Sequence, residues 1–153
     1  MEIFSVALNV VTCLAIFVAV WQLLFHARQM HRDLEMHFVA QYWQIMARAS
    51  TEWRLTHYLG KPVTQSDKHV LYDYLQLCED EVDLRANARV TDSTWALWAG
   101  AIASMVSIEH FAAAVNEAPE NVFPRLRNMM SVKNPETYDP LKKPLVWRRF
   151  HGL

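Results

Sequence analysis

The hydrophobic pattern of the chain divides it sharply near its beginning. Residues 3–25 contain no charged side chain and are almost all apolar. A run of about 20 apolar residues is long enough to cross the roughly 30 Å hydrocarbon core of a bilayer as one helix. Beyond Phe25, charged and apolar residues are mixed as in a water-soluble protein. The pattern therefore predicts a transmembrane helix within residues 1–25, in contact with a lipid bilayer and attached to a soluble body.

A helical repeat continues past this span. No Gly or Pro precedes Gly60, so one helix is expected to extend from the span as a stalk to about Leu59, where Gly60 and Pro62 favour a stop. Side chains that recur every three or four residues along the stalk form one packing stripe, as expected of a helix that buries a single face. The stripe consists of Met30, Leu34, Phe38, Gln41, Ile45, Ala49 and Trp53.

The rest of the chain also has helical periodicity. A helix over residues 66–88 is expected to bury Val70, Leu71, Tyr74, Leu75, Cys78 and Val82, with Glu79, Asp80 and Asp83 on its opposite face. The next helix starts at residues 91–94, a Thr-Asp-Ser-Thr cluster whose side-chain oxygens suit a helix N-terminus. It continues through Trp95 and Met105, or restarts at Ser107, and ends near Pro119. We expect a buried core helix here and not a second span, because a span would bury Glu109 and His110 in lipid.

A short helix over residues 120–130 is also expected, since Pro124 is tolerated in a first turn. From Val132 onward, Pro135, Pro140, Pro144 and Gly152 oppose regular structure. The predicted fold is therefore all-α. One N-terminal transmembrane helix (1–25) continues as a stalk into a small helical bundle (26–131), followed by an irregular basic and aromatic C-terminal arm (132–153).

The charges that flank the span predict its orientation. Glu2 precedes it, whereas Arg28 and Arg32 follow it closely, and short flanks rich in Lys and Arg stay on the cytoplasmic side. The expected location is the inner membrane, single-pass, with the N-terminus outside and the body in the cytoplasm. A cleaved signal peptide is the alternative, but a basic n-region and an A-x-A-like cleavage site are missing and the apolar run is too long.

One face of the predicted span carries polar side chains. At a helical period Ser5, Asn9 and Thr12 share a face that Ile16 and Leu23 continue. An amide in lipid needs a hydrogen-bonding partner, and a protein with one span would take it from another copy. This face is the predicted oligomer or pore interface of a homo-oligomer. The alternative is that Asn9 reaches water at the outer boundary of the membrane.

Composition excludes several function classes. Fifteen basic and sixteen acidic residues leave no global signature of polyanion binding, and two cysteines, Cys13 and Cys78, form no disulfide framework or metal-binding set. Three glycines cannot supply a Gly-rich phosphate loop, so nucleotide hydrolysis is not expected. We expect no cofactor and no metal site, since His26, His31 and His37 lack the spacing of zinc ligands. The acidic run at residues 79–83 is interpreted as a solvated helix face with Arg85 as an i,i+4 partner of Glu81.

Arg32 and His37 match the pattern R-x4-H with a polar residue after the Arg. This pattern resembles the signature of HEPN-type ribonucleases, in which Arg and His from two protomers act on the scissile phosphate. His is suited to proton transfer near neutral pH. Arg32 lies only about two turns past the membrane, which argues against nuclease work. The preferred interpretation is a non-enzymatic interfacial or inter-subunit role, with an anchored ribonuclease as the minority interpretation.

The C-terminal arm interleaves basic and apolar residues. Basic side chains are attracted to anionic lipid and aromatic rings settle at the membrane interface, so this arm is predicted to lie on the inner leaflet. A docking motif for a cytosolic protein partner is the near-equal alternative, contact with RNA is a further one, and a flexible tail is the simplest. The residues concerned are Lys142, Lys143, Trp147, Arg148, Arg149 and Phe150.

A single N-terminal span, a small helical body and Arg32 with His37 together resemble the membrane accessory proteins of type VI-B CRISPR systems. That resemblance implies rings that perforate the inner membrane during phage defence, with Arg32 and His37 in structural or gating roles. Residues 78–102 are also similar in pattern to uncharacterised bacterial one-span proteins. The expected function is thus a self-associating inner-membrane protein, such as a pore-forming or depolarising effector. The alternative is a membrane-anchored adaptor that presents a helical surface and basic arm to a cytosolic partner.

Overall fold

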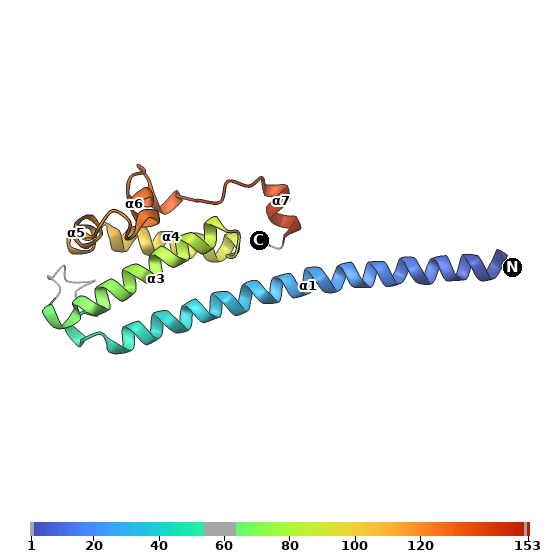
Figure 1. Cartoon of the computed structure of the whole chain (residues 1–153), viewed down its shortest axis with the longest axis horizontal. Coiled ribbons are helices and arrows are strands. Elements are labelled where there is room, and N and C mark those ends of the chain that lie inside the picture. The colour runs from blue at the N-terminus through green and yellow to red at the C-terminus, as the bar shows by residue number, and fades with distance from the viewer. Residues whose placement is uncertain (1, 54–63, 152) are drawn as a thin grey trace.

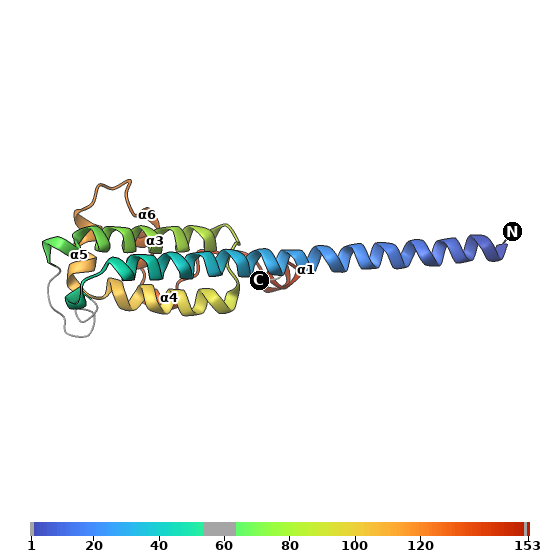
Figure 2. The same ribbon diagram turned by 90° about the horizontal axis from the view of Figure 1, so that it is seen from below.

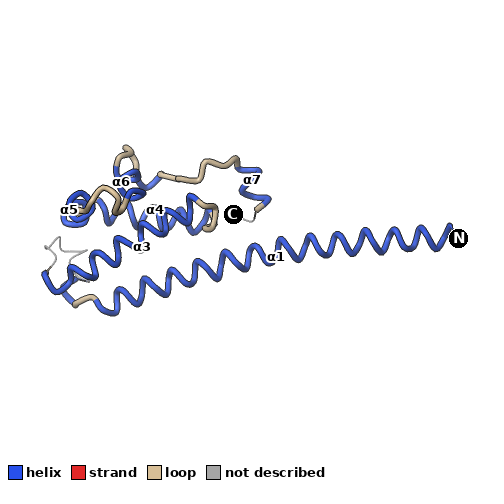
Figure 3. The backbone as a smooth tube through the Cα atoms, viewed as in Figure 1, coloured by secondary structure: helices blue, strands red, loops and turns tan. Residues whose placement is uncertain are grey.

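The computed structural model describes residues 2–53, 64–151 and 153, and it confirms the all-α fold (Figure 1). One long helix runs from the N-terminus into a bundle of shorter helices, and the described residues include no strand (Figure 3). The elements in chain order are α1 (Glu2–Arg48), η1 (Gln65–Asp67), α3 (Lys68–Ala86), α4 (Asp92–Val106), α5 (Glu109–Glu117), α6 (Pro124–Met130), η2 (Pro135–Thr137) and α7 (Leu145–Phe150).

Helix α1 is unbroken over 47 residues, as the absence of Gly and Pro predicts. It ends at Arg48 and not near Leu59, so the predicted stalk is too long; Leu59 itself lies outside the described residues. The reason is a tertiary contact. The backbone N–H and the hydroxyl of Ser50 both donate to the carboxylate of Asp67, at 3.1 and 2.6 Å, and this pulls the chain out of α1 toward the start of α3.

The second half of α1 packs along α3, and Phe38 of α1 also contacts Trp98 of α4. The axes of the three helices lie roughly along one direction (Figure 2). Ile45, Ala49 and Trp53 of the predicted stripe are buried, and Leu34, Phe38 and Gln41 are half-buried. Met30 is 61% exposed and does not belong to the packing face, because the bundle begins only beyond it.

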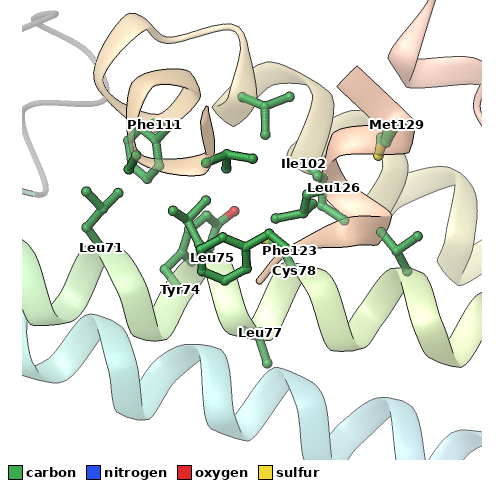
Figure 4. Packing of buried hydrophobic residues seen from close by; sticks show 14 of the residues in the cluster. Leu71, Tyr74, Leu75, Leu77, Cys78, Ile102, Phe111, Phe123, Leu126 and Met129 are labelled. Atoms are coloured by element: carbon green, nitrogen blue, oxygen red, sulfur yellow. The ribbon is translucent and has the colours of Figure 1, made fainter. Parts of the chain in front are cut away.

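Helix α3 forms the centre of the core. All six side chains predicted to be buried on it are at most 5% exposed, which confirms the prediction (Figure 4). They pack against Ile102 of α4, Phe111 of α5 and Leu126 of α6. Trp53 reaches the same cluster through an edge-on contact with Phe111, with ring centroids 5.4 Å apart.

The Thr91 cluster starts α4 as predicted, with the Thr94 N–H donating to the Thr91 hydroxyl at 3.4 Å. The chain restarts after Ser107, and α5 meets α4 at 89°. Trp95, Ile102 and Phe111 are buried among other helices, which confirms a core element. The fourth helix begins at Pro124 instead of residue 120, because Phe123 just before it has a left-handed φ of 58° that no helix continues through.

The arm is more ordered than predicted. It contains η2 and α7, each of which starts at or just after a proline that suits a first helical turn. Leu141 between them is 3% exposed, so the arm packs on the body. The prolines oppose long helices but permit short ones, and the prediction of a wholly irregular arm is wrong for this reason.

Candidate functional site

The first half of α1 projects from the bundle as an uncovered apolar rod. Every described side chain from Asn9 to Phe25 is exposed, including Phe17 at 71% and Leu23 at 70%. This helix is long and apolar enough to span a membrane, and it lies near the N-terminus. Apolar surface of this size facing solvent in a monomer marks a binding or membrane surface. The span predicted from sequence is therefore an uncovered helix in the structure.

The direction of the predicted polar face follows from the continuity of α1. Asn9 and Ile45 are separated by about ten full turns at 3.6 residues per turn, so they lie on the same side of the helix. Ile45 is 7% exposed because the bundle covers that side. Ile16 and Leu23 follow the same line, whereas the side chain of Ser5 lies outside the described residues. The face of Asn9, Thr12, Ile16 and Leu23 thus points to the side on which the body lies.

Arg32 and His37 are exposed on α1, at the end of the bundle nearest the uncovered half of the helix. They are separated by about 140° around the helix, so they do not share a face. His37 makes an edge-on contact with Phe38, with ring centroids 6.1 Å apart. The structure does not bring these two side chains together within one chain.

The neighbouring residues of α1 have a structural task that sequence reasoning missed. Glu35 accepts hydrogen bonds from the backbone N–H and the hydroxyl of Thr91, at 2.9 and 2.8 Å. One turn earlier, the His31 ring hydrogen-bonds to the Arg89 carbonyl at 2.9 Å. These bonds attach the stalk to the loop between α3 and α4. They join residues more than 50 positions apart, so no local pattern could reveal them.

The acidic run of α3 is only in part the solvated face that the sequence suggested: Asp80 is exposed and Asp83 half-buried, but Glu79 and Glu81 are buried. Glu79 is 8% exposed, and its carboxylate accepts hydrogen bonds from the backbone N–H groups of Arg125 and Leu126. Those groups belong to the first turn of α6, where free amides need an acceptor and a negative charge is favourable. Glu81 is 9% exposed, and burial, with the charge of Asp80 as a smaller cause, raises its pKa to about 8.

Arg85 is the largest fully buried side chain and not the exposed partner of Glu81 that was predicted. Its guanidinium donates to both carboxylate oxygens of Asp139, at 2.9 and 2.7 Å, to Asp92 at 2.5 Å and to the Val90 carbonyl at 2.9 Å. Arg148 of α7 lies 3.0 Å from Asp139 and 3.4 Å from Asp92. We call these four charged residues the arm lock, because they tie the C-terminal arm to α3 and α4.

The arm lock is electrically balanced. Burial alone would raise the pKa of Asp139, but hydrogen bonds from Arg85 and the Leu141 N–H, together with the charges of Arg85 and Arg148, lower it. Arg148 also donates to the Leu141 carbonyl at 2.7 Å. A cavity of about 270 Å³ borders this cluster, yet its charges satisfy one another. The arrangement is suited to holding the arm in place.

Most of the other predicted arm residues, in α7 and just before it, face solvent. Lys142, Lys143, Arg149 and Phe150 are exposed, with Phe150 at 70%. Trp147 is half-buried; the Lys143 ammonium lies over its ring, 5.4 Å from the centroid, and the His151 ring stacks on it. In Figures 1 and 2, α7 lies at the end of the body nearest the uncovered half of α1. Of the predicted arm residues, Arg148 alone is largely used inside the molecule.

No known protein family, curated protein or solved structure matches this chain.

Proposed function

We propose that this protein is a self-associating single-pass protein of the inner membrane that presents a rigid helical body at the cytoplasmic surface to a protein partner. The continuity of α1 carries this proposal. One unbroken helix, Glu2–Arg48, supplies both the uncovered apolar segment and a packed element of the bundle. No loop separates the two, so the body takes its position from the span. A flexible tether would need an interruption that α1 does not have.

Helix α7 supports a position close to the lipid. It lies at the span end of the body, and Leu145, Val146 and Phe150 are 57–80% exposed beside Lys142 and Lys143. Apolar side chains that enter the interface, next to cations that attract anionic headgroups, are the usual composition of a membrane-surface helix. The same cations favour the cytoplasmic side for the body.

The geometry favours such a scaffold over a pore. A ring with Asn9 facing its axis would also point the bodies toward that axis, because the bundle covers the same side of α1. Bodies at the axis would obstruct the path that a pore requires. A scaffold has no such conflict, since its bodies can spread outward from paired spans.

Position at the membrane can be tested with a fluorophore on α7 of the full chain. In a Cys13→Ser background, Val146→Cys is labelled with an environment-sensitive dye and reconstituted into vesicles with or without anionic lipid; Cys78 is buried and protected from labelling. We expect a blue-shifted emission that brominated lipid quenches, and loss of both effects on changing Lys142 and Lys143 to Glu. Asn121→Cys, in the exposed loop between α5 and α6, is the matched control.

Equal solvent exposure of the dye at Val146 and at Asn121 would refute the membrane-surface position. Extraction of the protein from membranes by alkaline carbonate would refute the proposed membrane anchor. A detergent-solubilised particle with the mass of a single chain would refute the proposed self-association. Charge reversal is preferable to deletion of the arm, because deletion would remove Asp139 and leave Arg85 buried without its main partner.

A further inference from the structure

The side of α1 opposite the bundle carries exposed apolar side chains both within the span and beyond it, with the polar Gln29 between the two groups. Met36 is 66% and Trp43 is 64% exposed, although both lie beyond the span. Met36 is about two and a half turns before Ile45 and Trp43 is about 200° from it, so both point away from the body. We call the residues of this line the outer stripe: Val11, Val18, Phe25, Met36, Ala40, Trp43 and Ala47, all of them exposed.

Lipid cannot cover the stalk part of the outer stripe. At about 1.5 Å per residue, Met36 lies roughly 16 Å beyond Phe25, and Trp43 roughly 27 Å beyond it. The headgroup region adds only about 5–8 Å to each side of the hydrocarbon core. The Trp43 ring also makes an edge-on contact with the ring of Tyr42, with centroids 5.3 Å apart. Met36 and Trp43 together form an exposed apolar surface that lipid does not reach, and surfaces of this kind mark protein contacts.

A second copy of this chain fits that requirement. Two copies anchored in one membrane run parallel, which places Met36 and Trp43 of both chains at the same height. Confinement to the membrane also raises their effective concentration. The bodies lie on the opposite side of α1, so pairing through the outer stripe keeps them apart. Pairing through the Asn9 face would press the two bodies together.

Small and charged residues agree with parallel pairing. Ala40 and Ala47 alternate with Met36 and Trp43, and small side chains let two helices approach closely. Arg32 and Asp33 are exposed on opposite flanks of the stripe, and neither makes an ion pair within the described part of the chain. A twofold axis parallel to α1 would bring Arg32 of one copy beside Asp33 of its partner.

We infer that two copies pair in parallel through the outer stripe, with Met36 and Trp43 at the centre of the contact outside the membrane. This inference rests on the proposed function, because only anchored copies are held parallel at one height. The outer stripe is then the surface through which the scaffold self-associates, and Asn9 lies outside this contact.

Cysteine cross-linking of the full chain in membranes tests the contact. In a Cys13→Ser background, Ala40→Cys is expected to form a covalent dimer with a short bifunctional maleimide. His37→Cys lies about 100° around the helix from Met36 and about 60° from Ala40, and is expected to give much less dimer. Asn9→Cys reports on the alternative face. Cross-linking through Asn9→Cys but not through Ala40→Cys would overturn the inference while leaving self-association intact.

A surface substitution provides the second measurement. Trp43→Glu is expected to weaken association by about 30-fold, as loss of a central Trp commonly does, and to reduce the mass of the solubilised particle to that of one chain. Leu97→Glu on α4, where Leu97 is 76% exposed, is the matched control and should leave the mass unchanged. An unchanged mass for Trp43→Glu would refute the outer stripe as the contact. A single-chain mass for the unaltered protein would instead refute self-association itself.

Discussion

Arg85 offers the sharpest test of how the body is held together. Replacing it with Met keeps most of the volume and the flexible stem but removes four hydrogen bonds, three of them to carboxylates. Asp139 would keep only Arg148 as an ion-pair partner, and its side chain is 25% exposed. The substitution therefore leaves partly buried negative charge without its main compensation.

The expected loss of stability follows from this geometry. Removing one partner of a buried ion pair costs about 3–5 kcal/mol. Asp92 and Asp139 reach solvent and Arg148 remains as a partner, so the loss should lie at the lower end of this range. We expect the free energy of unfolding to fall by about 3 kcal/mol. The arm should also detach, because Arg85 joins α3 to Asp139 across 54 residues of chain.

Two measurements on the detergent-solubilised full chain check this expectation. Chemical denaturation followed by far-UV circular dichroism gives the change in stability, and limited trypsin digestion reports cleavage after Lys142 as the arm is released. Arg89→Met is the control, since Arg89 is an exposed residue of the adjoining loop. The reasoning would be refuted if Arg85→Met unfolded within about 0.5 kcal/mol of the unaltered protein, the usual range of a neutral surface change, and digested at the same rate.

Three further substitutions test individual features of the body. Glu81→Gln should stabilise the protein at pH 7 by about 2–3 kcal/mol and have little effect near pH 4. The pKa of Glu81 is about 8 in the folded state and ordinarily 4.5, so between pH 4.5 and 8 the folded state retains a proton that the unfolded state loses. The stability of the unaltered protein therefore falls as pH rises from 4.5 to 8. A gain for Glu81→Gln that is the same at every pH in denaturation curves would contradict this. Ala88→Gly should raise the free energy of unfolding by about 1 kcal/mol, because Ala88 has a left-handed φ of 58° after α3; a lower melting temperature for this variant would contradict the expected relief of strain. Glu79→Ala should speed hydrogen exchange of the amides of Arg125 and Leu126 and cost about 1–2 kcal/mol, whereas unchanged exchange would exclude Glu79 as their acceptor.

Local patterns in the sequence determined the elements of this protein. Three local features sufficed to predict the uncovered apolar half of α1, the continuity of this helix and the start of α4. They are the uncharged run before His26, the lack of Gly and Pro before Gly60 and the Thr91 cluster. The buried residues of α3 followed from helical periodicity, because a helix that packs on one face repeats its apolar positions every three to four residues.

Tertiary structure decided which charged residues are inside. Glu79 is buried against the first turn of α6, and the buried Arg85 pairs with Asp139 of the C-terminal arm. The partners of both side chains lie about 45 to 55 residues further along the chain. The end of α1 at Arg48 depends likewise on the reach of Asp67 to Ser50. The candidate interface has the same origin. Periodicity alone places apolar residues on several faces of the stalk, and only the position of the bundle shows which face is left uncovered.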